Sequence, residues 1–247
     1  MILALAGGVG GAKLANGFAK SLSPDQLLIV VNTGDDFEHF GFPISPDLDT
    51  VTYTLAGMSN TTAGWGLAGE SWKFMNALER LGGEGWFRLG DQDLATHVMR
   101  AAWLSEGRNL SDVTAKITKR LGILHSIVPM SDQQVRTVVE TEAGRMSFQN
   151  YFVREQCGPV IKNIYYEGAT KANPSQAFMS ALDREDVDAI VICPSNPLLS
   201  IAPILALREV RARLVAHNAP VVAISPIIDG KAVKGPVAKI FKEIGLD

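Results

Sequence analysis

The chain has little cysteine: Cys157 and Cys193 are the only two among its 247 residues. They lie far apart and form neither a CxxC pair nor a cysteine and histidine spacing typical of zinc ligands. A disulfide framework and a structural zinc site are therefore excluded, and we expect a reducing, cytoplasmic location.

Charge of one sign and long apolar runs are also lacking. The 23 Lys and Arg residues stand against 26 Asp and Glu, a net charge of -3 without a basic stripe, so no nucleic-acid partner is expected. No apolar run is long enough to span a membrane, and no basic leader precedes residues 1–6, so no membrane partner is expected. The sequence also has no Ser-His-Asp order, GxSxG or HExxH motif, which disfavours acyl transfer and zinc hydrolysis.

Apolar residues are plentiful, at 47% of the total, enough for one domain spanning residues 1–247. Short runs rich in β-branched residues predict buried parallel strands at 2–6, 27–31, 189–193 and 221–224. Helical patterns lie between them, at 14–22, 71–81, 94–104, 113–121 and 201–216. This alternation predicts an α/β fold with a Rossmann-like, doubly wound, mostly parallel sheet. Residues 135–141 and 145–152 predict an accessory antiparallel hairpin, within an inserted region at roughly 45–175.

The first predicted strand runs into a glycine-rich turn, Gly7-Gly8-Val9-Gly10-Gly11-Ala12-Lys13. Residues without a Cβ let the backbone approach a ligand, and free amides at a following helix N-terminus bind anions. The spacing is neither GxGxxG nor GxxxxGK[ST]. The turn is therefore compatible with a dinucleotide site, a mononucleotide site or only a tight strand-to-helix connection.

Three other predicted strands also end in small polar residues, in Asn32-Thr33-Gly34-Asp35-Asp36, Pro194-Ser195-Asn196-Pro197 and Ser225-Pro226. In open α/β sheets, ligands bind beyond the carboxyl ends of the strands. A single polar strand end would merely reverse the chain, whereas four that converge favour a shared ligand.

Carboxylates cluster near these turns, as Asp35-Asp36, then Asp47 and Asp49, then Asp91 and Asp93. If residues 45–50 are an extended loop, Asp47 and Asp49 point to the same side and suit magnesium, which takes carboxylate, phosphate and water oxygens. The competing interpretation is structural, with Asp93 capping a helix and the SPDLD segment bracing a proline turn.

Together these stretches resemble one family, the CofD-type 2-phospho-L-lactate transferases of deazaflavin (coenzyme F-420) biosynthesis. The resemblance runs in order along the chain, in Gly7-Gly8-Val9-Gly10-Gly11-Ala12-Lys13, Asn32-Thr33-Gly34-Asp35-Asp36, Ile44-Ser45-Pro46-Asp47-Leu48-Asp49-Thr50, Leu89-Gly90-Asp91-Gln92-Asp93-Leu94-Ala95-Thr96-His97, Pro129-Met130-Ser131-Asp132, Pro194-Ser195-Asn196-Pro197 and Ser225-Pro226-Ile227-Ile228. It implies a Rossmann-like, Mg²⁺-dependent transferase that joins a guanylylated three-carbon phospho-acid to the deazaflavin Fo and releases GMP. The acid is phospholactate, phosphoenolpyruvate or phosphoglycerate.

By similarity, Asp49 and Arg88 contact Fo, and Asp49 and Asp47 are the catalytic candidates. The glycine turn and the PSNP segment serve the guanylyl side, which gives a substrate-binding set of Gly8, Gly10, Gly11, Lys13, Asn32, Ser195, Asn196 and Ser225 beside the Fo residues. From charge and position we assign Asp35 and Asp36 to magnesium, with Asp47 as a further candidate. Because Asp49 is expected in a loop, its replacement by Ala is expected to stop transfer and leave the fold intact.

Two departures accompany the resemblance. Gln92 stands where the family's Asp-Arg-Asp has arginine, and family members continue past the stretch equivalent to residues 239–247, so a C-terminal tail is expected to be missing. The resemblance also suggests a homodimer. The alternative is a YvcK-like regulator that binds a nucleotide-sugar without catalysis.

Overall fold

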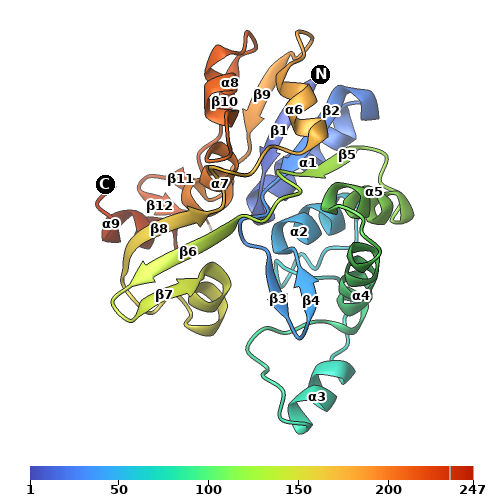
Figure 1. Ribbon diagram of the computed structural model, residues 1–247, viewed down its shortest axis with the longest axis vertical. Helices are drawn as coiled ribbons and strands as arrows, with labels where there is room; N and C mark the ends of the chain where they lie inside the picture. Colours follow the sequence, from blue (N-terminus) through green and yellow to red (C-terminus); the bar gives the residue numbers. More distant parts are fainter. Residues whose placement is uncertain (234, 247) are drawn as a thin grey trace.

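The computed structural model describes residues 1–233 and 235–246. Its centre is a five-stranded sheet in the order β10-β9-β1-β2-β5, with every neighbouring pair parallel (Figure 1). The strands are β1 (Ile2–Ala6), β2 (Leu27–Val31), β5 (Ser126–Pro129), β9 (Ala189–Ile192) and β10 (Val221–Ala223). The predicted parallel sheet is confirmed, and β5 is an additional strand that the sequence patterns did not reveal. The predicted burial of residues 221–224 was wrong, because β10 is the edge strand of the sheet and is exposed.

Helices cover both faces of this sheet, as a doubly wound fold requires. The α-helices of the described part of the chain are α1 (Gly8–Ser21), α2 (Pro46–Leu55), α3 (Lys73–Arg80), α4 (Asp91–Ser105), α5 (Leu110–Arg120), α6 (Gln176–Leu182), α7 (Ala202–Leu205), α8 (Val210–Ala216) and α9 (Val237–Glu243). On one face, Leu3 and Leu5 pack with residues of α6, α7 and α8. On the other face, Ala4 and Ala6 pack with residues of α1 and α2. The alternation of β1 side chains between two cores explains why this strand is apolar throughout.

The glycine-rich segment is itself helical. Helix α1 begins at Gly8, not at Leu14, after an extended Gly7. The predicted start was wrong because four glycines have low helix propensity, which tertiary contacts override. Close packing is the reason for two of them, since a Cβ on Gly10 would lie 2.1 Å from the Pro194 carbonyl oxygen and one on Gly11 would lie 2.5 Å from Ser195 Oγ.

The SPDLDT segment is also helical rather than a loop. It forms the first turn of α2, with Pro46 at the first helical position, where a missing N–H costs nothing. Asp47 and Asp49 therefore do not point to the same side, because residues two apart on a helix face in different directions.

A second, antiparallel sheet in the order β7-β6-β8 lies beside the main one (Figure 1). It consists of β6 (Arg136–Thr141), β7 (Gly144–Ser147) and β8 (Ile161–Glu167). The predicted hairpin is confirmed up to Ser147, but the chain then turns into the short helix η2 (Asn150–Arg154), so a strand to residue 152 was wrong. Phe148, Tyr151 and α9 residue Ile240 share a core with this sheet.

The remaining elements are short: η1 (Pro24–Gln26), the β3 (Phe37–His39) and β4 (Phe42–Ile44) hairpin, η3 (Pro197–Ile201), and the β11 (Ile227–Ile228) and β12 (Lys231–Ala232) hairpin. The predicted single helix over 201–216 is interrupted where Glu209 adopts a φ of 65°. No helix within the described part of the chain is long and apolar enough to cross a membrane.

Candidate functional site

The strand order reverses between β1 and β9, and the loops after these strands meet there. Ser195 Oγ accepts a hydrogen bond from Gly7 N at 3.0 Å and donates one to Gly7 O at 2.8 Å. Asn196 accepts from the backbone N–H groups of Leu198 and Leu199, which caps η3. The predicted convergence of the PSNP segment and the glycine stretch is thus present, with their polar groups bonded to each other.

Asp47 lies at the centre of this junction. Its Oδ1 accepts from Gly8 N at 2.8 Å, and its Oδ2 accepts from Asn32 Nδ2 at 2.9 Å. Asn32 in turn donates to Leu199 O and accepts from Gly34 N, so its amide joins the loop after β2 to α2 and η3. Burial raises the pKa of Asp47, opposed by the hydrogen bonds from Asn32 and Gly8.

Asp35 and Asp36 follow β2, close to Asp47. Both side chains are buried, and the Oδ1 atom of each has no hydrogen-bond partner among the described residues. Burial, with repulsion from Asp47, raises the pKa of Asp35 well above its usual range, and burial raises that of Asp36 to about 8. Ser45 Oγ donates to the other Asp36 oxygen at 2.8 Å. Carboxylate oxygens of this kind are the hard donors that a divalent cation binds, together with water and phosphate oxygens.

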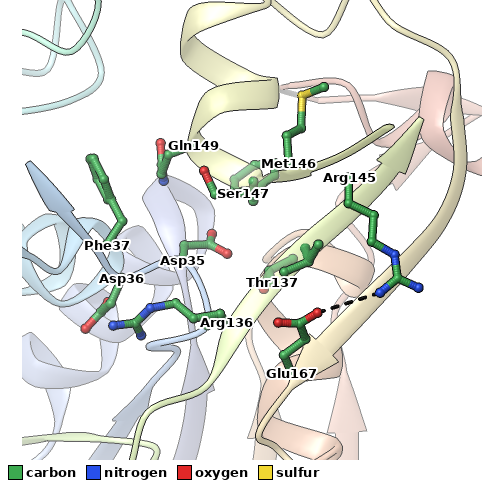
Figure 2. A pocket seen from close by; sticks show the side chains of 13 residues that line it. Asp35, Asp36, Phe37, Arg136, Thr137, Arg145, Met146, Ser147, Gln149 and Glu167 are labelled. Atoms are coloured by element: carbon green, nitrogen blue, oxygen red, sulfur yellow. Dashed lines mark ion pairs between the residues drawn. The ribbon is translucent and has the colours of Figure 1, made fainter. Parts of the chain in front are cut away.

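These two carboxylates border a cavity of about 340 Å³ (Figure 2). The cavity is bounded by the loop after β2, the face of the second sheet and the start of η2, and its lining is Gly34, Asp35, Asp36, Phe37, Arg136, Thr137, Val138, Arg145, Met146, Ser147, Phe148, Gln149 and Glu167. Thr137 N donates to Gly34 O at 2.7 Å, which fixes β6 against this loop.

Asp49 belongs to a separate, buried polar network. Arg100 of α4 donates Nη1 to Asp49 Oδ2 at 3.2 Å and Nη2 to Asp49 Oδ1, a bidentate pair. His97 Nδ1 lies 3.1 Å from Arg100 Nη1, and His97 Nε2 lies 3.2 Å from Asp93 Oδ2. Tyr53 donates to the other Asp93 oxygen at 2.6 Å. Asp49 is thus part of the buried framework, which contradicts its predicted loop position.

The ligand atoms of Asp49, Asp93 and His97 lie within 4.8 Å of one another, a spacing compatible with a metal. Here, however, Arg100 and Tyr53 already supply positive charge and a hydroxyl donor to the two carboxylates. The Oδ1 atoms of Asp35 and Asp36, by contrast, have no such donor among the described residues.

Arg88 lies at the surface, and its guanidinium stacks over the Trp72 ring at 4.5 Å. Trp72 and Trp65 have ring centroids 6.0 Å apart and line a small hollow that also includes Asp93. Because Asp93 contacts His97, this hollow adjoins the Asp49 network. Trp65 and Trp72 thus form an aromatic surface beside Arg88.

Two other predicted residues lie outside these contacts. Lys13 is exposed on α1. Ser225, exposed after β10, closes its own turn by accepting from Ile227 N at 3.0 Å.

The sequence patterns did not point to Arg100, Arg136 or Arg145. Arg100 is 2% exposed and lies one turn after His97 on α4. The available signal was the spacing of Asp93, His97 and Arg100, which places three polar residues on one helix face. Arg136 and Arg145 occur in the predicted hairpin, but nothing in the sequence places that hairpin against Asp35.

Comparison with known proteins identifies relatives of the chain. A family model described as 2-phospho-L-lactate transferase CofD matches residues 2–247. The chain is 39% identical to a phosphoenolpyruvate transferase of Kitasatospora aureofaciens, over 100% of this chain and 78% of that protein. It is 38% identical to a 2-phospho-L-lactate transferase of Methanopyrus kandleri, over 98% of this chain and 77% of that protein.

Among solved structures, a Bacillus halodurans protein of the UPF0052 family superposes with a TM-score of 0.62 at 17% identity, over 99% of this chain and 76% of that one. At that identity the likeness supports the fold alone. From the family match and the identities to the curated relatives, the chain belongs to the CofD family of 2-phospho-L-lactate transferases and is a transferase.

Proposed function

We propose that this transferase moves a phospho-three-carbon-acid unit from its GMP-activated diphosphate to the deazaflavin Fo, with Mg²⁺, in cytoplasmic coenzyme F-420 biosynthesis. One observation carries the proposal: in a chain of this family, Asp35 and Asp36 hold buried oxygens without partners at the edge of a ligand-sized cavity. Unsatisfied buried carboxylates are costly unless a ligand completes them.

In the proposed reaction, the terminal ribityl hydroxyl of Fo attacks the phosphorus that bears the acid. The new P–O bond forms as the bond from that phosphorus to the bridging oxygen breaks, and its electron pair leaves with GMP. The hydroxyl proton passes to a carboxylate, for which Asp49 and Asp47 are the predicted candidates. Bound magnesium would neutralise charge on the diphosphate.

Positioning accounts for most of the catalysis that such a reaction needs. Asp35 and Asp36 would hold the cation, because their Oδ1 atoms are unpartnered. Asp47 is a weaker candidate ligand, because both its oxygens already accept hydrogen bonds from Gly8 and Asn32. At the acceptor end, Arg88 and the Trp72 ring would contact the deazaflavin, beside the network that contains Asp49.

Two acids fit the relatives equally well. The relatives named above are a phosphoenolpyruvate transferase and a 2-phospho-L-lactate transferase, at 39% and 38% identity. These acids share a carboxylate on the carbon that bears the phosphate, so we treat that group as the common recognition element.

The test incubates the chain with Fo, Mg²⁺ and each guanylylated acid, phospholactate, phosphoenolpyruvate or phosphoglycerate, and follows GMP and the phosphodiester-linked deazaflavin by chromatography. We expect both products in equal amounts from at least one donor, and neither when Fo is omitted. Asp35→Asn should slow transfer at least about 100-fold, a loss of about 2.7 kcal/mol of transition-state stabilisation. Nucleotide binding without product in the presence of Fo would favour the regulatory alternative.

A further inference from the structure

One wall of the cavity is the exposed face of the second sheet. Arg136 pairs with Glu167 across β6 and β8, Val138 pairs with Ser147 across β6 and β7, and Glu140 pairs with Arg145. Directly paired residues and residues two apart along a strand project from the same face. The two arginines, Ser147 and Glu167 therefore lie on one face of the sheet and line the cavity, with the Arg145 guanidinium turned toward Glu167 (Figure 2).

Arg145 is held in position with few of its donors used. Its guanidinium stacks over the Tyr165 ring at 4.4 Å. Its ion pairs with Glu140 and Glu167 are 3.9 and 4.0 Å long, beyond hydrogen-bonding distance. Glu140 is occupied, because Tyr165 OH donates to it at 2.7 Å. A stacked, planar fork with unused N–H groups is suited to bidentate binding of a carboxylate.

Arg136 lies at the other end of the cavity, where Figure 2 shows its guanidinium turned toward Asp36. Burial lowers the pKa of Arg136, while attraction to Asp36 raises it. Its Nη1 donates to the Val135 carbonyl oxygen at 2.8 Å, which anchors the side chain to its own strand. The positive charge at this end thus faces the proposed cation ligands.

We propose that this cavity is the subsite for the three-carbon acid, with Arg145 binding the α-carboxylate and Arg136 facing the phosphate. The inference rests on the proposed function and adds Arg136 and Arg145, to which that proposal gives no role. The volume, about 340 Å³, is at the lower end of small-molecule pockets, so it suits a small phospho-acid better than a whole guanylylated donor. A divalent cation on Asp35 and Asp36 would give the cavity the positive charge that such an anion needs.

Binding of the free acids provides the test, because it does not require turnover. Isothermal titration calorimetry would compare 2-phospho-L-lactate and phosphoenolpyruvate with ethyl phosphate, which lacks the carboxylate, in the presence of Mg²⁺. We expect the wild type to bind the acids about 10- to 100-fold more tightly than ethyl phosphate, the range of one charge-assisted pair. Arg145→Ala should abolish this preference, and Arg145→Lys should restore only part of it because the fork is lost.

Arg184→Ala is the matched control. Its side chain is 48% exposed, against 54% for Arg145, and it pairs with Asp186 outside the cavity lining. This variant should retain the full preference, and the Tm of each variant checks that the fold is intact. In the transfer assay, Arg145→Ala should raise the KM of the guanylylated donor by a similar factor while Fo affinity stays the same.

Two binding results would overturn the assignment: no preference for carboxylated ligands in the wild type, or a preference that survives in Arg145→Ala. A loss of Fo binding in Arg145→Ala with acid binding unchanged would also overturn it, because the cavity would then be an acceptor site. Failure of the proposed function looks different. A wild type that binds the acids in a carboxylate-dependent manner but transfers none of them to Fo would refute the transfer reaction and support the subsite.

Discussion

Replacing Arg100 by Met should destabilise the protein strongly, because it removes one partner of a buried ion pair. Arg100 is 2% exposed and Asp49 is 7% exposed, so the variant leaves a carboxylate without its bidentate donor and away from water. It also removes the bond from Arg100 Nη1 to the Pro43 carbonyl oxygen at 3.3 Å. Breaking a buried pair by removing one partner costs about 3–5 kcal/mol.

For a chain of this size, that cost lowers Tm by roughly 6–20 °C, at about 2–4 °C per kcal/mol. Urea unfolding followed by far-UV circular dichroism measures it directly. The double variant Asp49→Leu with Arg100→Met removes both charges and should lose much less than the two single variants together. Arg184→Met, at the surface, should change stability by less than about 1 kcal/mol. A similarly small loss in Arg100→Met, or additive losses in the double variant, would refute the ion pair as a structural element.

Three further predictions use the same measurements. In metal-free protein, the folded pKa of Asp36 is raised from 3.8 to about 8, so the free energy of unfolding should fall as pH rises between these values, by at most about 1.4 kcal/mol per pH unit. Urea titrations at several pH values should show a smaller slope for Asp36→Asn, and an unchanged slope would contradict the assignment. Gly10→Ala should lower the free energy of unfolding by more than about 1 kcal/mol because the added Cβ would meet the Pro194 carbonyl oxygen, whereas Gly17→Ala, where the Cβ meets open space, should raise it by about 0.4–1 kcal/mol. Equal effects of the two variants on Tm would refute the packing argument. In fluorescence titrations, Arg88→Ala should weaken Fo binding by about 5- to 30-fold, because the proposed contact between the guanidinium and the deazaflavin is lost, and should leave guanine-nucleotide binding unchanged. An unaltered Fo affinity would remove Arg88 from the site.

The centre of the main sheet was predictable because β1 and β2 are buried on both faces and consist of uninterrupted apolar residues. The predicted ranges 2–6 and 27–31 coincide with β1 and β2. β5 was missed because only four residues, Ser126–Pro129, form it, and a short run bounded by proline carries little pattern.

The polar elements were harder to predict because tertiary contacts determine them. Four glycines concealed the first turns of α1, which pack against Pro194 and Ser195, residues more than 180 positions away in the sequence. In α2, Pro46 after Ser45 was a usable helix-start signal that was interpreted as a loop.

The candidate site shows the same limit. The sequence motifs identified Asp35, Asp36, Asp47 and Asp49 as candidate site residues, and all four are buried near strand or helix ends. Which of them carries an open oxygen depends on the donors that surround it. Asp49 is paired with Arg100, 51 positions away in the sequence, and no local pattern encodes that pairing.

The contacts of Asp47 bear on where an anionic substrate can bind. A helix N-terminus is an anion site because its first N–H groups lack partners. In α1, the Asp47 carboxylate already accepts from Gly8 N, in the position that the phosphate-cradle interpretation gives to a phosphate. A phosphate would have to displace this carboxylate. Asp35 is close by, and repulsion between Asp47 and Asp35 already contributes to the raised pKa of Asp35. The cavity beside Asp35 and Asp36 imposes no such exchange, because the Oδ1 atoms of these two carboxylates have no hydrogen-bond partner to lose among the described residues, and Arg145 makes only long ion pairs.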